Sequence, residues 1–319
     1  MSTVLIAGGT GLIGKNLTSH LINKGYDVII LSRKPVNDTN EKQIAYAVWD
    51  INKQEIDSNA LSKADYIIQL SGAGVMDKRW TSKYKKEIVE SRTKSSQLII
   101  KGLQQNGNKV KAMISASAIG WYGKDPSTSM QHWDGFNESD KPDIGFLGET
   151  CRLWEESIEP VTAMGIRLVK LRQGIVLSND GGAFTEFKKP LRFGIAAILG
   201  SGKQMISWIH IDDVCRMFIY AIENGNLSGI YNAVTPSPVS NKQFIIKTAE
   251  LLRKGFYIPL YVPDFFLKLI LGEKSIEILK SATVSCNKIK NEGFIFLYPS
   301  LGSALGELIK SSILRQDSH

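Results

Sequence analysis

The sequence predicts an α/β fold, in which a doubly wound parallel sheet is joined to a smaller, mostly helical C-terminal lobe. Short apolar runs alternate with helical patterns through the first 180 residues, as repeated βαβ units require. From about residue 256 the chain is expected to be helix and loop, because its apolar spacing is helical, most clearly in "FFLKLILGEKSIEILKS". We therefore expect a sheet domain over 1–180, with 205–235 returning to it. The smaller lobe should comprise 181–204 and 236–319.

The parallel sheet is predicted from a series of apolar runs bounded by turn residues. The first, "TVLIA", ends in a glycine cluster, and "DVIILS" follows one helical pattern later. In order, the runs are at 3–7, 27–32, 45–49, 66–70, 111–117, 167–172 and 229–234. The clearest helical patterns between them are at 82–105 and 148–159. Right-handed crossovers between such units place helices on both faces of one sheet.

The composition favours a globular protein of a reducing compartment. The 319 residues are 43% hydrophobic, which is enough to bury a large core. No apolar run approaches the ~20 residues that span a bilayer. Because a strand pattern begins at residue 3, we expect no targeting segment. Cys151, Cys215 and Cys286 are far apart and form no C-x-x-C motif, so we predict neither disulfides nor a metal site. We expect a cytoplasmic protein that does not bind membranes.

The net charge of +8 raises the question of nucleic-acid binding. The densest basic stretch, "KRWTSKYKKEIVESRTK" at 78–94, has helical spacing with Glu87 and Glu90 interleaved. This pattern is typical of a solvated helix face, and no nucleic-acid-binding module accompanies it. We therefore expect no nucleic-acid partner, whereas a basic groove for a phosphorylated ligand stays open.

A glycine-rich loop, "GGTGLIG" at 8–14, lies directly after the first strand and opens a helix. In such loops Gly8 permits the tight turn, Gly11 lets the backbone approach a pyrophosphate, and Gly14 lets helix and strand pack closely. The N–H groups at the start of the helix then attract the phosphates. The loop predicts a dinucleotide site of the Rossmann type.

The end of the second strand indicates which dinucleotide binds. An NAD site places Asp or Glu about 20 residues past the glycines, where it binds the ribose hydroxyls. This chain has Ser32, Arg33 and Lys34 there instead. A carboxylate would repel the 2′-phosphate of NADP, whereas a hydroxyl and a guanidinium can bind it. We predict NADP(H) as the cofactor.

With these motifs the chain resembles an extended short-chain dehydrogenase/reductase, and within that superfamily the atypical NAD-dependent epimerase/dehydratase-like branch formerly labelled cell-division-inhibitor-like. Further matching segments follow in order along nearly the whole chain. They include "LSGAGVMDKRW", "SASAIGWYG", "LRQGIVLSNDGGAF", "LGSGKQMISWIHIDDV" and "GIYNAVTP", and the small C-terminal lobe with "GFIFLYPSLGSAL". The resemblance implies an NADP(H)-dependent oxidoreductase or epimerase acting on a small molecule, as a monomer or homodimer.

The resemblance also assigns the cofactor-binding residues. Those of the phosphate loop and the adenosine ribose are Gly8, Thr10, Gly11, Leu12, Ile13, Gly14, Ser32 and Arg33. Those expected along the nicotinamide half are Leu70, Ser71, Gly72, Ser115, Ala116, Gln173, Gly174 and Ile175. Ser117 matches the catalytic hydroxyl at the reaction centre. Gln173 stands where the family carries Thr, so the contact of that segment with the nicotinamide amide is in question.

The segment "FLGETCRLWEE" departs from the wider superfamily. There a tyrosine begins the helix, and a lysine one turn later lowers the pKa of its phenol. Phe146 and Thr150 occupy the two positions here. Several other groups could pass a proton, although each has a simpler structural interpretation: Tyr122 with Lys124, His132, Cys151, His210, and Asp212 with Asp213. Two functions stay open, an enzyme with another proton path and a non-catalytic NADP(H)-binding sensor or scaffold.

A substrate site is expected in a cleft between the sheet domain and the smaller lobe. Arg79 and Trp80 on one side, with Lys188 and Arg192 on the other, could hold an anionic or planar substrate. The sequence does not identify that substrate.

Overall fold

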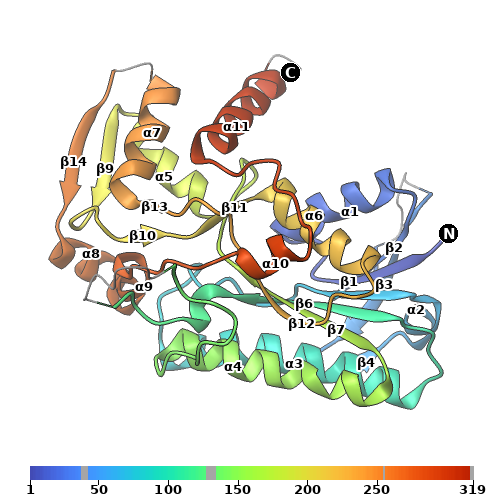
Figure 1. Ribbon diagram of the computed structural model, residues 1–319. Helices are drawn as coiled ribbons and strands as arrows, with labels where there is room; N and C mark the ends of the chain where they lie inside the picture. The colour runs from blue at the N-terminus through green and yellow to red at the C-terminus, as the bar shows by residue number, and fades with distance from the viewer. Residues whose placement is uncertain (37–41, 127–133, 254–255, 317–319) are drawn as a thin grey trace. The chain divides into compact units, whose positions relative to one another are not determined.

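The structure is a computed structural model that describes residues 1–36, 42–126, 134–253 and 256–316. These residues form two compact units (Figure 1). The first comprises Met1–Trp121, Pro142–Arg172 and Val214–Tyr231, and the second Tyr122–Lys141, Gln173–Asp213 and Asn232–His319. The described residues of 122–141, together with 173–180, 205–213 and 232–235, thus belong to the second unit, whereas the sequence patterns assign them to the sheet domain.

An eight-stranded sheet forms the centre of the first unit. Its strands, in spatial order, are β12 (Gly229–Ala233), β7 (Arg167–Gln173), β6 (Ala112–Ala118), β5 (Tyr66–Gln69), β1 (Thr3–Ala7), β2 (Asp27–Ser32), β3 (Ile44–Asp50) and β4 (Glu55–Ile56). Strand β1 pairs in parallel with β2 and β5, and the pairs β2–β3 and β5–β6 are also parallel. Strand β4 runs antiparallel to β3. The chain crosses from β1 outward in both directions, so the predicted doubly wound α/β fold is confirmed.

Helices cover both faces of this sheet (Figure 1). Helices α1 (Leu12–Asn23) and α6 (Ile211–Glu223) lie on one face, where Lys24 Nζ meets Glu223 Oε1 at 2.8 Å. Helices α3 (Ser82–Gln105) and α4 (Phe146–Ile158) lie on the other, next to the short α2 (Ser58–Lys63) and the 3₁₀ turns η1 (Ile119–Trp121) and η2 (Glu159–Met164). The core on this second face includes Leu5, Ile29, Leu98 and Ile158. Apolar strands buried on both faces explain the continuous hydrophobic runs in the sequence.

The second unit combines short strand pairs with helices. Strands β8 (Ile175–Leu177) and β11 (Trp208–His210) are parallel, as are β9 (Ile195–Leu199) and β14 (Ile258–Val262), whereas β10 (Met205–Ile206) and β13 (Val239–Ser240) are antiparallel. The helices are α5 (Ala183–Leu191), α7 (Asn241–Arg253), α8 (Asp264–Leu271), α9 (Ser275–Leu279), α10 (Asn287–Asn291) and α11 (Leu301–Gln316), with the 3₁₀ turn η3 (Gly272–Lys274). Phe184, Trp208 and Phe244 lie at the centre of the core of this unit.

Local patterns explain most of these elements. The predicted helix at 82–105 has the same bounds as α3, and the side chain of Thr81 caps it by accepting the Tyr84 N–H at 3.2 Å. The sequence predicts helix and loop from about residue 256, but this part of the chain begins with strand β14, because its backbone pairs with the distant strand β9. The described residues after β14 do contain helices and loops. The sequence "SWIHIDDVCRMFIYAIEN" at 207–224 predicts a loop that leads into a helix. Residues 208–210 instead form strand β11, because their backbone pairs with a distant strand that their own sequence does not specify. No described helix is both long and apolar enough to cross a bilayer.

Candidate dinucleotide site and buried polar cluster

The glycine-rich loop connects β1 to the first turn of α1. Gly11 is the N-cap residue, in extended conformation, and no side chain caps the helix. The first turn of α1 also contains no acidic residue. The N–H groups at this helix start therefore have no anionic or hydroxyl side chain competing for them, and the helix dipole favours a negatively charged ligand there.

Two glycines shape the loop so that a phosphate can approach its backbone. Gly8 has a φ of +86°, a conformation that side chains rarely adopt. A Cβ at Gly14 would lie 2.3 Å from the Gly8 carbonyl oxygen, so only glycine permits this packing of helix against strand. Gly11 donates its N–H to the same oxygen at 3.0 Å and closes the turn. The loop thus forms a cradle that fits a pyrophosphate, and Thr10, Leu12 and Ile13 belong to it.

The end of β2 lies beside this loop, because β1 and β2 are paired in register up to Ala7 and Leu31. Ser32 is the last residue of the strand, and its Oγ accepts the Lys34 N–H at 3.3 Å. Arg33 is exposed and makes no ion pair with a described residue. Its guanidinium is therefore available to an anionic group bound next to the loop.

Hydrogen bonds to the ends of β1 and β5 hold the segment that follows β5. Leu70 donates its N–H to the Ala7 oxygen at 2.8 Å, and Ser71 Oγ donates to Gln69 Oε1 at 2.9 Å. Gln69 in turn donates from Nε2 to Ser95 Oγ on α3 at 2.7 Å. The predicted residues Leu70, Ser71 and Gly72 thus follow the carboxyl end of β5, the same edge of the sheet from which the glycine loop leaves β1.

Ser117 belongs to a buried polar cluster that connects β6, α4 and β7. Its Oγ donates to Glu155 Oε1 at 2.6 Å. Arg172 donates from Nε to Glu155 Oε1 at 2.8 Å and from Nη2 to Oε2 at 3.0 Å. The residues Ser117, Glu155 and Arg172 are 2%, 4% and 0% exposed, and the centroid of the Trp121 ring lies 3.7 Å from the Arg172 guanidinium carbon. A hydroxyl, a carboxylate and a guanidinium are thus held together away from solvent.

Glu155 and Arg172 were not predicted as functional residues from the sequence. The available signal was an arginine at an inward position of the apolar strand "RLVKLRQ", because such a charge requires a buried partner. The sequence did not show that the partner lies on the helix that begins with Phe146. Ser115 and Ala116, on the same strand as Ser117, are buried too, and Ser115 Oγ donates to the Ala116 oxygen at 3.1 Å.

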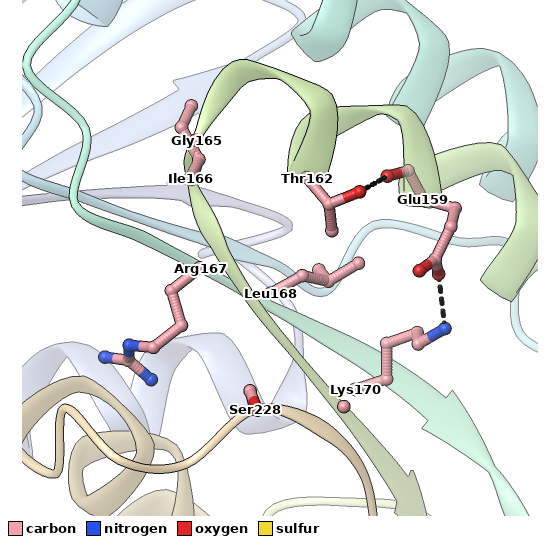
Figure 2. A pocket seen from close by; sticks show the side chains of 9 residues that line it. Glu159, Thr162, Gly165, Ile166, Arg167, Leu168, Lys170 and Ser228 are labelled. Atoms are coloured by element: carbon pink, nitrogen blue, oxygen red, sulfur yellow. Dashed lines mark hydrogen bonds and ion pairs between the residues drawn. The ribbon is translucent and has the colours of Figure 1, made fainter.

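A second ion pair repeats this arrangement one helical turn further on. Lys170 Nζ meets Glu159 Oε2 at 2.6 Å, two residues before Arg172 on β7 and four after Glu155 (Figure 2). These two residues line a pocket of about 350 Å³ together with Thr162, Arg167 and Ser228. The pocket lies near the first residues of β7 and β12, at the opposite end of β7 from Arg172. It is therefore distinct from the polar cluster around Ser117.

Phe146 and Thr150, at the start of α4, are held by packing and by a hydrogen bond within the helix. The Phe146 ring contacts Trp80 edge-on, with centroids 4.9 Å apart. Thr150 Oγ1 donates to the Phe146 carbonyl oxygen at 2.6 Å within α4. Trp80 also donates from Nε1 to the Val75 oxygen at 2.8 Å and is buried, whereas Arg79 is exposed. Neither Phe146 nor Thr150 presents a group that titrates.

Other candidate proton donors have structural roles. Burial raises the pKa of the Cys151 thiol to about 12, so it stays protonated. Tyr122 is buried and its hydroxyl donates to Asn232 Oδ1 at 2.6 Å, whereas Lys124 is exposed. His132 lies outside the described residues.

His210 and Asp213, at the start of α6, also accept hydrogen bonds from backbone N–H groups. Burial lowers the pKa of His210 to about 4, and its Nδ1 accepts the Asp212 N–H at 3.2 Å. The Asp213 carboxylate accepts the N–H groups of Leu297 and Tyr298 at 2.8 and 2.9 Å. It thus anchors the chain ahead of α11, a role that its position in the sequence did not indicate.

In the second unit, the segment after β7 already uses its backbone donors. Gly174 donates its N–H to the Ala233 oxygen and Ile175 to the Ser207 oxygen, both at 3.0 Å. Gln173 Nε2 is buried and bonds to no described residue, which makes it the donor in this segment with capacity for a ligand.

The remaining predicted substrate residues lie on and just after α5. Lys188 Nζ donates to Asn179 Oδ1 at 2.7 Å, and burial, followed by the charge of Arg192, lowers the pKa of Lys188. Arg192 is exposed at the end of the helix. No group of three or more possible metal ligands occurs among the described residues.

The sequence of this chain is similar to known protein families and to known proteins. Residues 4–140 match the NAD dependent epimerase/dehydratase family, and residues 262–308 match a domain of unknown function, DUF1731. The epimerase family protein YfhF of Bacillus subtilis (strain 168) is 36% identical over 307 residues, 96% of this chain and 97% of that protein. An epimerase family protein of Staphylococcus aureus (strain NCTC 8325 / PS 47) is 33% identical over 310 residues, 97% of this chain and 100% of its own length.

A solved structure is also similar. The crystal structure of the human epimerase family protein SDR39U1 (isoform 2) with NADPH has a TM-score of 0.84 and 27% sequence identity, and the match covers 97% of this chain and 99% of the human one. The similarity to the human protein thus includes residues of both units.

Proposed function

Because the chain belongs to the NAD-dependent epimerase/dehydratase family, we propose that it is an NADP(H)-dependent oxidoreductase or epimerase-like enzyme acting on a small molecule. The observation that carries the proposal is the cradle at the start of α1, where the uncapped helix and the Gly8–Gly14 packing suit a pyrophosphate. NADPH in the structure of the human relative supports the choice of dinucleotide.

In this proposal the residues of the glycine loop hold the pyrophosphate, and Ser32 and Arg33 bind the phosphate on the adenosine ribose. Leu70, Ser71 and Gly72 follow the next strand end and line the nicotinamide half, together with the ends of β6 and β7. The cofactor supplies the hydride chemistry, and the protein supplies orientation and a proton path. The buried Gln173 Nε2 is the donor we assign to the carboxamide, in place of the family's threonine.

The proton path that we propose runs through Ser117 and Glu155. When an alcohol substrate is oxidised, its O–H proton passes to Ser117 Oγ as the Ser117 proton passes to Glu155 Oε1, 2.6 Å away. Reduction of a carbonyl reverses both transfers. Arg172 balances the carboxylate charge when the proton is absent. In this proposal the path replaces the tyrosine and lysine, whose positions we assign to Phe146 and Thr150.

A substrate with an anionic group is part of this proposal. Arg79 and Arg192 are exposed guanidinium groups, which can bind carboxylate or phosphate in bidentate fashion. Trp80 and Lys188 are engaged in local hydrogen bonds, so we assign them to the support of neighbouring residues.

One observation favours a second function, that of a non-catalytic NADP(H)-binding sensor or scaffold. Ser117 is 2% exposed, and its hydroxyl is already bonded to Glu155. If no substrate reaches Ser117 Oγ, the cluster only stabilises the fold, and the cofactor would act as a ligand whose binding is sensed.

The two functions are separated by one experiment on the purified protein. Mass spectrometry first identifies any co-purifying dinucleotide, and calorimetry compares NADPH with NADH. NADPH oxidation is then followed over a carbonyl library with the natural protein, Ser117→Ala, and the double variant Phe146→Tyr with Thr150→Lys. Turnover that depends on Ser117 supports the enzyme. Tight NADPH binding with no turnover in any variant supports the sensor, and equal affinity for NADPH and NADH contradicts the cofactor assignment.

A further inference from the structure

Arg92, on α3, is a half-buried arginine that forms no ion pair with a described residue. Its Nη1 donates to the Ala73 oxygen at 3.0 Å and to the Ile88 oxygen at 2.9 Å. Burial, the largest effect, lowers the pKa of the guanidinium, although an arginine side chain stays charged in a protein. Charges held away from solvent are ordinarily paired with an opposite charge. Arg92 therefore has capacity for an anionic partner.

The two carbonyl oxygens occupy only one nitrogen of this guanidinium. Arginine has five N–H donors, of which two are on Nη1. Nε and Nη2 of Arg92 bond to no described residue. They also differ from the buried nitrogens that lack a partner among the described residues, which are Trp154 Nε1, Gln173 Nε2 and His210 Nε2. Nε and Nη2 of Arg92 are therefore accessible to solvent, and we call them the open side of Arg92.

Arg172 shows what this side of a guanidinium binds. Its Nε and Nη2 donate to the two carboxylate oxygens of Glu155 at 2.8 and 3.0 Å. These two nitrogens present parallel N–H groups, whose spacing matches the two oxygens of a carboxylate. The open side of Arg92 has the same two donors but no carboxylate from the described residues. A bound ligand can supply one.

The surroundings of Arg92 hold the guanidinium in place and leave its open side uncovered. Helices α3 and α4 pack side by side (Figure 1), and the centroid of the Trp154 ring lies 5.0 Å from the Arg92 guanidinium carbon. Gly72 is exposed, and a Cβ there would lie 3.0 Å from that carbon and 3.2 Å from Nε. A side chain at this position would crowd the open side, whereas glycine leaves it accessible.

The neighbours of Arg92 connect it to the proposed reaction centre. Gly72 belongs to the segment after β5 that we assign to the nicotinamide half of the cofactor. Trp154 directly precedes Glu155, which accepts the Ser117 hydroxyl at 2.6 Å. Because the guanidinium lies against both Gly72 and Trp154, its open side is near the cofactor segment and near the proposed proton path.

We propose that the open side of Arg92 binds a carboxylate of the substrate and so selects carbonyl compounds that carry an acid group. One guanidinium neutralises one carboxylate, whereas a phosphate, with a charge of about −1.5 to −2, would stay partly unneutralised. Arg79 and Arg192 are fully exposed, where an ion pair contributes little. This inference rests on the proposed function, because it names the substrate class of the same site.

The test compares ligands that differ in the acid group. Ligand-detected NMR measures the binding of pyruvate, 2-oxobutyrate and phenylpyruvate, and of their methyl esters, to the protein loaded with NADP⁺, which cannot reduce them. We expect the natural protein to bind at least one acid more tightly than its ester. Arg92→Gln should weaken that acid about tenfold to a hundredfold and leave the ester unchanged. Arg92→Lys, which keeps the charge but loses the parallel donors, should retain part of the preference.

The matched control is Arg152→Gln on α4. Arg152 is an arginine whose partners are Glu149 and Glu156, so its loss should leave the affinity for the acid unchanged. Circular dichroism checks the folding of each variant. If Arg92→Gln does not fold, the reduced preference in Arg92→Lys tests the same contact.

Four results would overturn the inference. The natural protein binds none of the acids, or it binds acid and ester equally. Arg92→Gln weakens acid and ester alike, as a purely structural role in holding the Ala73 and Ile88 oxygens requires. Inorganic phosphate displaces the acid at a lower concentration than acetate does, which would assign the open side to a phosphoryl group.

The measurement of binding keeps this inference separate from the proposed function. Acid binding that depends on Arg92, without turnover of any carbonyl compound by NADPH, contradicts the enzyme and leaves the assignment of Arg92 intact. Turnover of neutral carbonyl compounds without a preference for acids contradicts the assignment of Arg92 alone.

Discussion

Ser117 Oγ donates to Glu155 Oε1 at 2.6 Å, and the carboxylate that accepts this bond is also held by the guanidinium of Arg172. The three side chains come from β6, α4 and β7, so the cluster fixes the helix against the two strands. A buried ion pair costs desolvation and is sustained by good geometry and further hydrogen bonds. This cluster has both, since the carboxylate accepts from Nε, Nη2 and a hydroxyl.

The first prediction concerns Glu155→Gln. The substitution keeps the shape of the side chain and removes the negative charge that accepts from Nε and Nη2 of Arg172, so the buried guanidinium loses this ion pair. Breaking a buried pair in this way costs about 3–5 kcal/mol, so the urea midpoint should fall markedly. Glu149→Gln is the matched control on the same helix. Because Glu149 and Arg152 form an exposed pair, that variant should unfold at the natural midpoint. Equal midpoints for the two variants would contradict a buried ion pair.

The second prediction separates the structural role of Ser117 from its chemical role. Ser117→Ala removes one hydrogen bond but leaves Glu155 paired with Arg172, so the free energy of unfolding should fall by only about 1 kcal/mol. If Ser117 relays the proton, turnover should fall by about 10²–10⁴-fold while NADPH affinity is unchanged. The pH dependence of turnover provides a readout that a structural role would not change. Full turnover in Ser117→Ala would exclude Ser117 from the reaction centre.

The sheet was predictable from the sequence because its information is local. Apolar runs such as 3–7 and 27–32 are bounded by glycines or polar turns, and these signals survive in a single sequence. The glycine loop was identified for the same reason, since spacing alone places Gly8, Gly11 and Gly14 between a strand and a helix.

The polar cluster could not be predicted in the same way, because it depends on three elements meeting in space. Glu155 reads as one of several acidic residues on an amphipathic helix, and its burial is decided by the docking of α4 against β7. The short strands β8 and β11 were missed for a related reason, since each has only three residues and forms only with its distant partner.

A third prediction follows from the burial of His210. Burial lowers its pKa from 6.5 to about 4 in the folded state. Between these two pH values the unfolded chain therefore binds more protons than the folded chain. The stabilisation contributed by the neutral ring is therefore complete above pH 6.5 and is lost as the pH falls toward 4, with a total of about 3 kcal/mol at most. We expect the Tm of the natural protein to decline over this range, and His210→Asn to decline less. Parallel Tm profiles for the two proteins would show that His210 does not titrate as proposed.

The last prediction concerns the choice of dinucleotide. Arg33 is exposed at the end of β2, next to the glycine loop, and makes no ion pair with a described residue, so a bound 2′-phosphate can become its partner. A hydrogen bond to a charged group contributes about 1.5–3 kcal/mol, so Arg33→Ala should weaken NADPH about tenfold to a hundredfold and leave NADH unchanged. Arg33→Asp should reverse the preference, because a carboxylate repels the phosphate and can bind ribose hydroxyls. Lys34→Ala is the control for the loss of one positive charge at this turn and should have a smaller effect on NADPH. Calorimetry at fixed salt measures all four proteins, and an unchanged ratio of NADPH to NADH affinity in Arg33→Ala would show that the 2′-phosphate is bound elsewhere.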